Sequence, residues 1–425
     1  MLAGGQFAST IGDYCYAVAL PWLVLSTHGG TILLGTVLAC YGVPRTVLIP
    51  LGGVLADKIG PRSIMLLADV GRCTLVAVLA VLAAGHIASL AALGPIAALI
   101  GAGEGLFLPA SYAIMPSLLD SERLAAGNAI STAAVQAGSL LGPALGGALV
   151  AVTGSSTGAF GIDAGSFAVS ALTLALIPRR AASGSVAAAV PETAGATEKA
   201  GQAEADDGLG GGVLDLLRRS RALQVLLVIV VVANLTSGGM GDVALPALAH
   251  ARFGAAGYGA LLACLAAGGV IGTLAAARTG GLRAPMMFAV PFILLFSLAI
   301  GLVPYVGEGG AAAALLVAGA SSGLGNVTLL TVVQKWASPA LLGRLMGAVM
   351  LCAFGSFPLS VAVSGVLVKH LGPSVFFPIA GGLVAVTMLG GLTQRDFRVF
   401  GARERAGDAA GLTEQPGKPS ERAVG

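Results

Sequence analysis

The sequence predicts an all-α integral membrane protein with twelve transmembrane helices in two six-helix halves. Three observations lead to this prediction: the composition, a series of long apolar runs, and a polar segment near the middle of the chain. Of the 425 residues, 56% are hydrophobic and only 10% are charged, and the mean hydropathy is +0.91. About a quarter of the residues in soluble domains are charged, so this composition indicates a lipid environment.

The apolar runs define the expected membrane spans. A helix needs about twenty apolar residues to cross roughly 30 Å of hydrocarbon. Short polar or glycine-rich connections separate most of the runs, so neighbouring spans must run antiparallel. The twelve runs are 5–27, 31–56, 64–84, 90–112, 127–152, 157–178, 222–247, 257–278, 285–306, 311–334, 344–368 and 373–393.

A polar segment, 179–221, separates the sixth run from the seventh. It is rich in Ala, Gly, Ser and Glu, and its end carries leucines beside arginines. A segment of this composition cannot bury a core, so we expect a disordered cytoplasmic linker that ends in a short interfacial helix. It joins an N-terminal half, 1–178, to a C-terminal half, 222–394, which a cytoplasmic tail, 395–425, follows.

The two halves resemble each other weakly in helices five and eleven. Parallel repeats of this kind place a substrate site between the halves, near the middle of the membrane. The matching residues are Gly127, Pro143, Gly147, Gly154 and Phe160 in the first half and Gly343, Pro358, Gly365, Gly372 and Phe376 in the second.

The basic residues predict the orientation. If both termini are cytoplasmic, nineteen Lys and Arg residues lie on the cytoplasmic side, and only Arg252 and Lys369 lie outside. Arg45 and Arg72 remain within the membrane. This asymmetry follows the positive-inside rule, so we expect a multi-pass protein of the cell membrane.

Several classes of function lack support. The net charge is only +3, and the basic residues form no cluster that could bind the phosphates of a nucleic acid. No nucleic-acid partner is therefore expected. The five cysteines fall in apolar runs without metal-ligand spacing, so neither a metal nor a cofactor is expected. The sequence has no hydrolase or metalloprotease motif and no repeated filter-like loop, which disfavours an enzyme and a channel.

A glycine and charge motif follows the second span: Gly53, Asp57, Lys58, Gly60 and Arg62. Gly53 permits close helix approach, Gly60 turns the chain, and Asp57 can pair with Lys58 or Arg62 or face a helix N-terminus. This pattern resembles the loop signature of the major facilitator superfamily, G-x-x-x-D-[RK]-x-G-x-[RK]. The resemblance implies a cytoplasmic latch between the halves; the alternative is a solvated loop with chance charges.

A second motif lies in helix five: Gly138, Gly142, Pro143, Gly146 and Gly147. It resembles the antiporter signature of drug and proton exporters, g-x-x-x-G-P-x-x-G-G. Small residues at these spacings let two helices meet backbone to backbone, and the proline bends the helix. The alternative is ordinary glycine packing in a chain with 64 glycines.

The resemblance extends over nearly the whole chain, with one departure. Residues 97–105 in helix four contain no arginine, although many proton-coupled drug exporters carry R-x-x-Q-G there. The proton-relay role of that arginine therefore does not transfer to this chain. The residues that resemble the macrolide-efflux and siderophore-exporter branch are Asp69, Arg72, Phe107, Leu108, Pro109, Ala110, Asp163 and Phe167.

Three charged residues lie near the middle of their spans: Asp13, Arg45 and Glu104. Each costs about 2.5–3.5 kcal/mol on insertion scales, so such charges indicate function unless they find partners. We predict that Asp13 is the carboxylate that couples proton movement to transport, and that Arg45 is its electrostatic partner. Glu104 is the second candidate for the coupling carboxylate. The alternative for Asp13 is a structural role. Asp69 and Arg72 share a helix face at i, i+3 and are expected to pair structurally.

Polar and aromatic residues in other spans are candidates for the substrate cavity. For each, hydrogen bonding or packing between helices is an equal alternative. The candidates are Tyr16, Asn234, Asn326, Thr328 and Phe354.

Together these features predict a monomeric secondary transporter that exports small amphipathic molecules, such as a drug, an antibiotic or a siderophore. Proton antiport by alternating access is the expected mechanism, so protons, the substrate and the lipid bilayer are its partners. A lysolipid flippase or uniporter of the same fold without proton coupling is the alternative, which the missing helix-four arginine favours.

Overall fold

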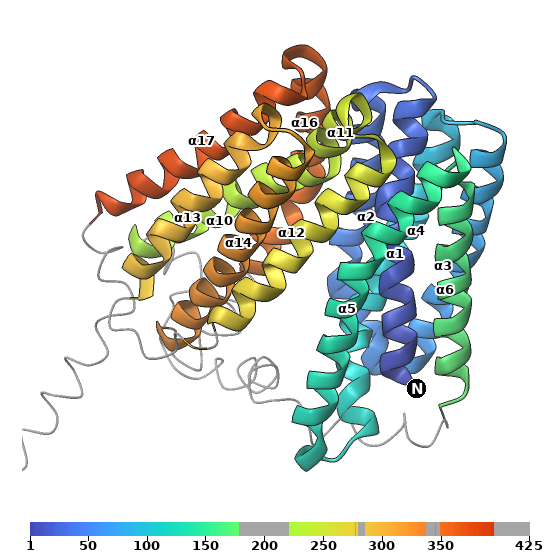
Figure 1. Ribbon diagram of the computed structural model, residues 1–425. Coiled ribbons are helices and arrows are strands. Elements are labelled where there is room, and N and C mark those ends of the chain that lie inside the picture. Colours follow the sequence, from blue (N-terminus) through green and yellow to red (C-terminus); the bar gives the residue numbers. More distant parts are fainter. Residues whose placement is uncertain (178–220, 277, 279–284, 337–344, 346–348, 395–425) are drawn as a thin grey trace, which may run out of the picture.

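The computed structural model describes residues 1–177, 221–276, 278, 285–336, 345 and 349–394 (Figure 1). Most of the expected linker, and the whole of the expected tail, lie outside these residues. Every regular element in the described part is helical. The elements are α1 (Leu2–Ser26), α2 (Gly30–Ile59), α3 (Pro61–Ala84), α4 (Leu90–Leu118), α5 (Ser121–Thr153), α6 (Thr157–Ala175), α10 (Arg221–Gly239), η2 (Met240–Ala244), α11 (Leu245–Arg252), α12 (Gly254–Ala276), α13 (Pro285–Leu302), η3 (Val303–Tyr305), α14 (Glu308–Trp336), α16 (Phe357–Leu371) and α17 (Pro373–Leu392).

Among the described residues, eleven helical segments are long and apolar enough to cross a membrane. A twelfth apolar segment, Val290–Tyr305, is shorter. One span, Leu223–Arg252, is composite, because the π-helical turn η2 interrupts it between α10 and α11. The predicted fold class, an all-α membrane protein with two six-helix halves, is confirmed.

The two halves repeat one packing pattern. In the first half α2 packs on α4, α3 on α6, and α1 on both α5 and α6. In the second half α12 packs on α14, α13 on α17, and α10 on both α16 and α17. Since equivalent helices pair in each half, the weak sequence similarity reflects a parallel structural repeat.

The halves contact each other through equivalent helix pairs, α5 with α12 and α2 with α16. Gly147 in the last third of α5 lies against Gly259 near the start of α12, and Gly35 near the start of α2 lies against Gly365 in α16. These contacts are at the end of the bundle opposite the N-terminus. Figure 1 shows the ribbons of the two halves meeting at that end and diverging toward the N-terminus.

The main buried core continues across the halves at the end where they meet. It joins Leu20 and Leu34 of the first half to Tyr258, Leu261 and Val361 of the second. The contact between the halves is therefore apolar, and it holds one end of the bundle closed.

Candidate functional site

The main ionic cluster forms where α4 approaches α2 closely. At Gly101 a Cβ atom would lie 2.0 Å from the carbonyl oxygen of Tyr41, and at Gly105 it would lie 2.5 Å from that of Arg45. Only glycine permits such an approach of two backbones. Because Glu104 lies between these glycines, its side chain comes within reach of both Tyr41 and Arg45.

Arg45 and Glu104 form an ion pair, with 3.0 Å between Nη2 of Arg45 and Oε1 of Glu104. The hydroxyl of Tyr41 donates a hydrogen bond to Oε2 of the same carboxylate. Both carboxylate oxygens therefore have a partner. The two charged side chains are 19% and 25% exposed, so neither is sealed in the core.

Arg45 also contacts the other half of the molecule. Its guanidinium carbon lies 5.1 Å from the ring centroid of Phe354, within the range of a cation–π interaction. The next residue along α2, Thr46, donates a hydrogen bond of 3.1 Å to the carbonyl oxygen of Phe354. The cluster thus links a carboxylate of the first half to an aromatic ring of the second.

Asp13, which we predicted as the partner of Arg45, does not pair with it in this structure. The ion pair of Arg45 is with Glu104. Asp13 is exposed on α1, and the carbonyl of Ala17, one turn further on, lies 3.5 Å from the hydroxyl of Tyr258 in the other half. Because residues i and i+4 share a helix face, Asp13 lies on the face of α1 that is directed toward the C-terminal half.

Asp69 and Arg72 form the ion pair that their spacing predicts, with 2.7 Å between Nη2 of Arg72 and Oδ1 of Asp69. Both side chains are buried inside the N-terminal half. The hydroxyl of Ser170 in α6 donates a 2.6 Å hydrogen bond to the second oxygen of Asp69. The guanidinium carbon of Arg72 lies over two aromatic rings, 4.4 Å from the ring centroid of Phe107 and 4.3 Å from that of Phe167. These contacts join α3, α4 and α6 and give the pair a structural role.

The glycines of the helix-five motif contact two different helices. At Gly138, Gly142 and Gly146 a Cβ atom would meet α1, at 2.8 Å from Thr10, 2.6 Å from Tyr14 and 2.9 Å from Cys15 respectively. Gly147 instead meets α12, where its Cβ would lie 2.6 Å from the carbonyl oxygen of Ala255. The motif, with Pro143 inside the helix, thus packs α5 both within its own half and against the other.

The motif after the second span forms a tight helix connection. Gly60 ends α2 and begins α3 with a φ of 86°, a conformation that glycine adopts readily. The guanidinium of Arg62 donates hydrogen bonds of 2.9 Å to the carbonyl oxygens of Leu174 and Ala175, which end α6. Asp57 and Lys58 are exposed, and no ion pair joins them within the described residues.

The cavity candidates are scattered. Tyr16 packs edge-on against Phe160 of α6, with 5.8 Å between the ring centroids. Asn234 and Thr328 donate hydrogen bonds to carbonyls of their own helices, whereas Asn326 is exposed on α14. Phe354 is the candidate that the structure brings to Arg45 and Glu104.

Two residues of this region escaped the sequence reasoning. Tyr41 could have been found, because it precedes Arg45 by four residues and so shares its helix face. Asp242 lies in the π-helical turn η2, a feature that often marks functional sites. This turn contacts α2, the helix that carries Arg45.

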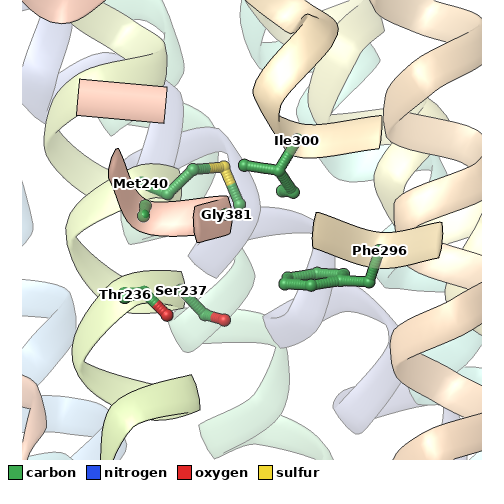
Figure 2. A pocket seen from close by; sticks show the side chains of 7 residues that line it. Thr236, Ser237, Met240, Phe296, Ile300 and Gly381 are labelled. Atoms are coloured by element: carbon green, nitrogen blue, oxygen red, sulfur yellow. The ribbon is translucent and has the colours of Figure 1, made fainter. Parts of the chain in front are cut away.

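Figure 2 shows a narrow recess beside the same π-helical turn, with an empty volume of about 160 Å³. Its walls come from the end of α10, from the first residue of η2, from α13 and from α17, and they carry no charged residue. The lining residues are Thr236, Ser237, Met240, Phe296, Ile300, Ala380 and Gly381. The recess lies wholly within the C-terminal half and is separate from the ionic cluster.

Comparison with known proteins fits this architecture. The sequence profile of the Major Facilitator Superfamily matches residues 2–361. The chain belongs to this superfamily. It is therefore a multi-pass membrane transporter rather than an enzyme, and small-molecule substrates are expected of it.

Two curated relatives align along most of the chain. The uncharacterized MFS-type transporter YfiS of Bacillus subtilis is 27% identical and covers 92% of each chain. The multidrug efflux pump Tap of Mycolicibacterium fortuitum is 26% identical and covers 85% of this chain and 87% of its own. A solved structure of a POT family transporter in complex with a thioalcohol-conjugated peptide is similar in fold, with a TM-score of 0.67 at 17% identity over 92% of this chain and 94% of its own.

Proposed function

We propose that this major facilitator protein exports small amphipathic molecules across the cell membrane by proton antiport. The observation that carries the proposal is the ion pair between Arg45 and Glu104, which reaches the second half through Phe354. Similarity to a multidrug efflux pump supports a drug as the substrate, within the wider class of drugs, antibiotics and siderophores that we propose. The transporter acts as a monomer, because each chain supplies both halves of the fold.

The cluster couples a proton to a change in the contact between the halves. When Glu104 accepts a proton, its charge no longer holds Arg45, and the guanidinium keeps only its contacts with Tyr41 and Phe354. Arg45 then becomes available to Asp242 of the C-terminal half or to Asp13 on α1. When Glu104 loses the proton, the original ion pair forms again.

Both termini lie in the cytoplasm in this proposal, as the basic residues predict. The closed end of the bundle is then the outer end, and the conformation described is open toward the cytoplasm. The exposed face of α1 that carries Asp13 is available to a substrate and to protons from that side.

The test is ΔpH-driven transport of ethidium, a lipophilic cation, into inverted membrane vesicles. We expect Glu104→Gln to lower this transport to the level of vesicles without the protein, while ethidium binding to the purified variant is retained. Glu122→Gln is the matched control, because Glu122 is exposed in the first turn of α5 and should be dispensable.

Full ΔpH-driven transport by Glu104→Gln would contradict the role of this carboxylate. Transport that survives collapse of the pH gradient by nigericin would instead support the flippase or uniporter alternative. The lack of an arginine in residues 97–105 is the observation that favours this alternative.

A further inference from the structure

A further carboxyl group inside a span, Asp163 of α6, belongs to neither ion pair. The residue is 1% exposed, and its Oδ1 atom is buried without a hydrogen-bond partner. The absence of a Cβ at Gly12 of α1 makes room for it, because a Cβ there would lie 2.6 Å from Oδ1. The carboxyl group is thus packed against the backbone of the residue that precedes Asp13.

No cation forms an ion pair with Asp163 within the described residues. Arg72 is the nearest candidate, but its guanidinium pairs with Asp69 and stacks on Phe107 and Phe167, and no ion pair joins it to Asp163 within the described residues. The other ionisable groups that face Asp163 are the carboxyls of Asp13 and Glu104, the thiol of Cys15 and the hydroxyl of Tyr16. Each of these is neutral or adds negative charge.

An ionised carboxylate without a partner is very costly in a protein interior, whereas a protonated carboxyl is neutral. We propose that Asp163 is a second proton-binding group of this transporter, separate from Glu104, and that it carries its proton in the conformation described. The protonated state is independent of the proposed function, whereas its part in coupling rests on that function.

Infrared spectroscopy of the reconstituted protein tests the protonated state directly. Protein labelled with ¹³C at the aspartate carboxyl is compared with unlabelled protein at neutral pH, so that aspartic acid bands shift and the Glu104 band does not. We expect a label-sensitive carbonyl band of a protonated acid that is lost in Asp163→Asn and kept in Asp13→Asn. Gly161→Ala, on the same helix and with no atom within 4 Å of its Cβ position, is a further control and should retain the band.

A wild-type protein without any label-sensitive acid band would overturn the proposal, and so would a band that Asp163→Asn retains. If Asp163→Asn does not fold, Gly12→Ala provides the second variant, since its methyl group would press on Oγ of Ser166 and on Oδ1 of Asp163, and so shift the band. Gly4→Ala on the same helix adds a methyl group to open space and should not shift it. An unshifted band in Gly12→Ala would count against the assignment.

The two proposals fail in different ways. If ethidium transport proves independent of the pH gradient while the Asp163 band behaves as expected, proton antiport is wrong and the protonated carboxyl stands. If transport depends on the gradient and on Glu104 but the band is missing, Asp163 is not a proton site.

Discussion

Gly259 in α12 offers a direct test of how the two halves are held together at the closed end. Its Cβ position lies 2.3 Å from the carbonyl oxygen of Pro143 and 2.9 Å from Cα of Gly147, both in α5. These neighbours are backbone atoms and cannot rotate away. We predict that Gly259→Ala destabilises this conformation specifically, because the contact joins the two halves rather than helices within one half.

The structure gives the size of the effect. An ordinary contact begins at 3.4 Å, so α5 and α12 must separate by about 1 Å to accommodate the methyl group. Overpacking of this kind costs about 1–3 kcal/mol. In a conformation where this end is open the contact is absent, so the equilibrium should shift toward that conformation by about 5- to 150-fold.

Spin labels at Glu122→Cys and Leu274→Cys, at the other ends of α5 and α12, would report the shift. Both positions are exposed, and the labels require a background in which the five native cysteines are replaced. Electron–electron resonance measures the distribution of distances between them. Gly259→Ala should increase the population with the shorter separation, because the N-terminal end closes as the opposite end opens.

Gly269→Ala is the matched control, since it lies on the same helix and a Cβ there has no atom within 4 Å. It should leave the distance distribution as in the parent protein. If Gly259→Ala and Gly269→Ala gave the same distribution, the close backbone contact would not be what holds the closed end, and the reasoning would be refuted.

Three further predictions concern the latch, the linker and Asp13. Asp57→Asn should lower transport while expression and substrate binding stay intact, and a wild-type rate would exclude the latch. Replacing residues 184–205 with a Gly/Ser stretch of equal length should preserve activity, because a flexible segment needs only to span its ends; loss of transport in a correctly inserted variant would indicate a specific partner. Asp13→Asn should retain substrate binding and lose ΔpH-driven antiport, because the neutral side chain is then unable to receive Arg45 when Glu104 is protonated; full antiport would remove Asp13 from the mechanism.

The sequence predicts the spans well because crossing a bilayer requires long apolar runs that hydropathy reveals directly. It also predicts local pairs. Asp69 and Arg72 are one helical turn apart, so their contact depends on helix geometry alone. The glycines of α5 were recognised as packing residues for the same reason, although the sequence does not say that Gly147 faces the other half.

The sequence could not select the partner of Arg45. Span counting gives the depth of a residue in the membrane but not the direction that its side chain takes around the helix. Glu104 reaches Arg45 because Gly101 and Gly105 bring α4 against α2, and that approach is a tertiary event between distant segments. The π-helical turn at Asp242 escaped prediction too, because hydropathy carries no sign of a single widened turn.

The two halves share the same helix packing but differ in the number of charged residues inside their spans. Within the described residues, the charged groups that lie inside the spans belong mostly to the N-terminal half: Asp13, Arg45, Asp69, Arg72, Glu104 and Asp163, against Asp242 in the C-terminal half. Each costs about 2.5–3.5 kcal/mol on insertion scales. The C-terminal half builds the same helix pairs almost without such charges, and in the first half the contacts of Asp69 and Arg72 account for that pair as a structural one. We infer that Asp13, Arg45, Glu104 and Asp163 serve transport, and that the contact of Arg45 with Phe354 carries their effect to the second half.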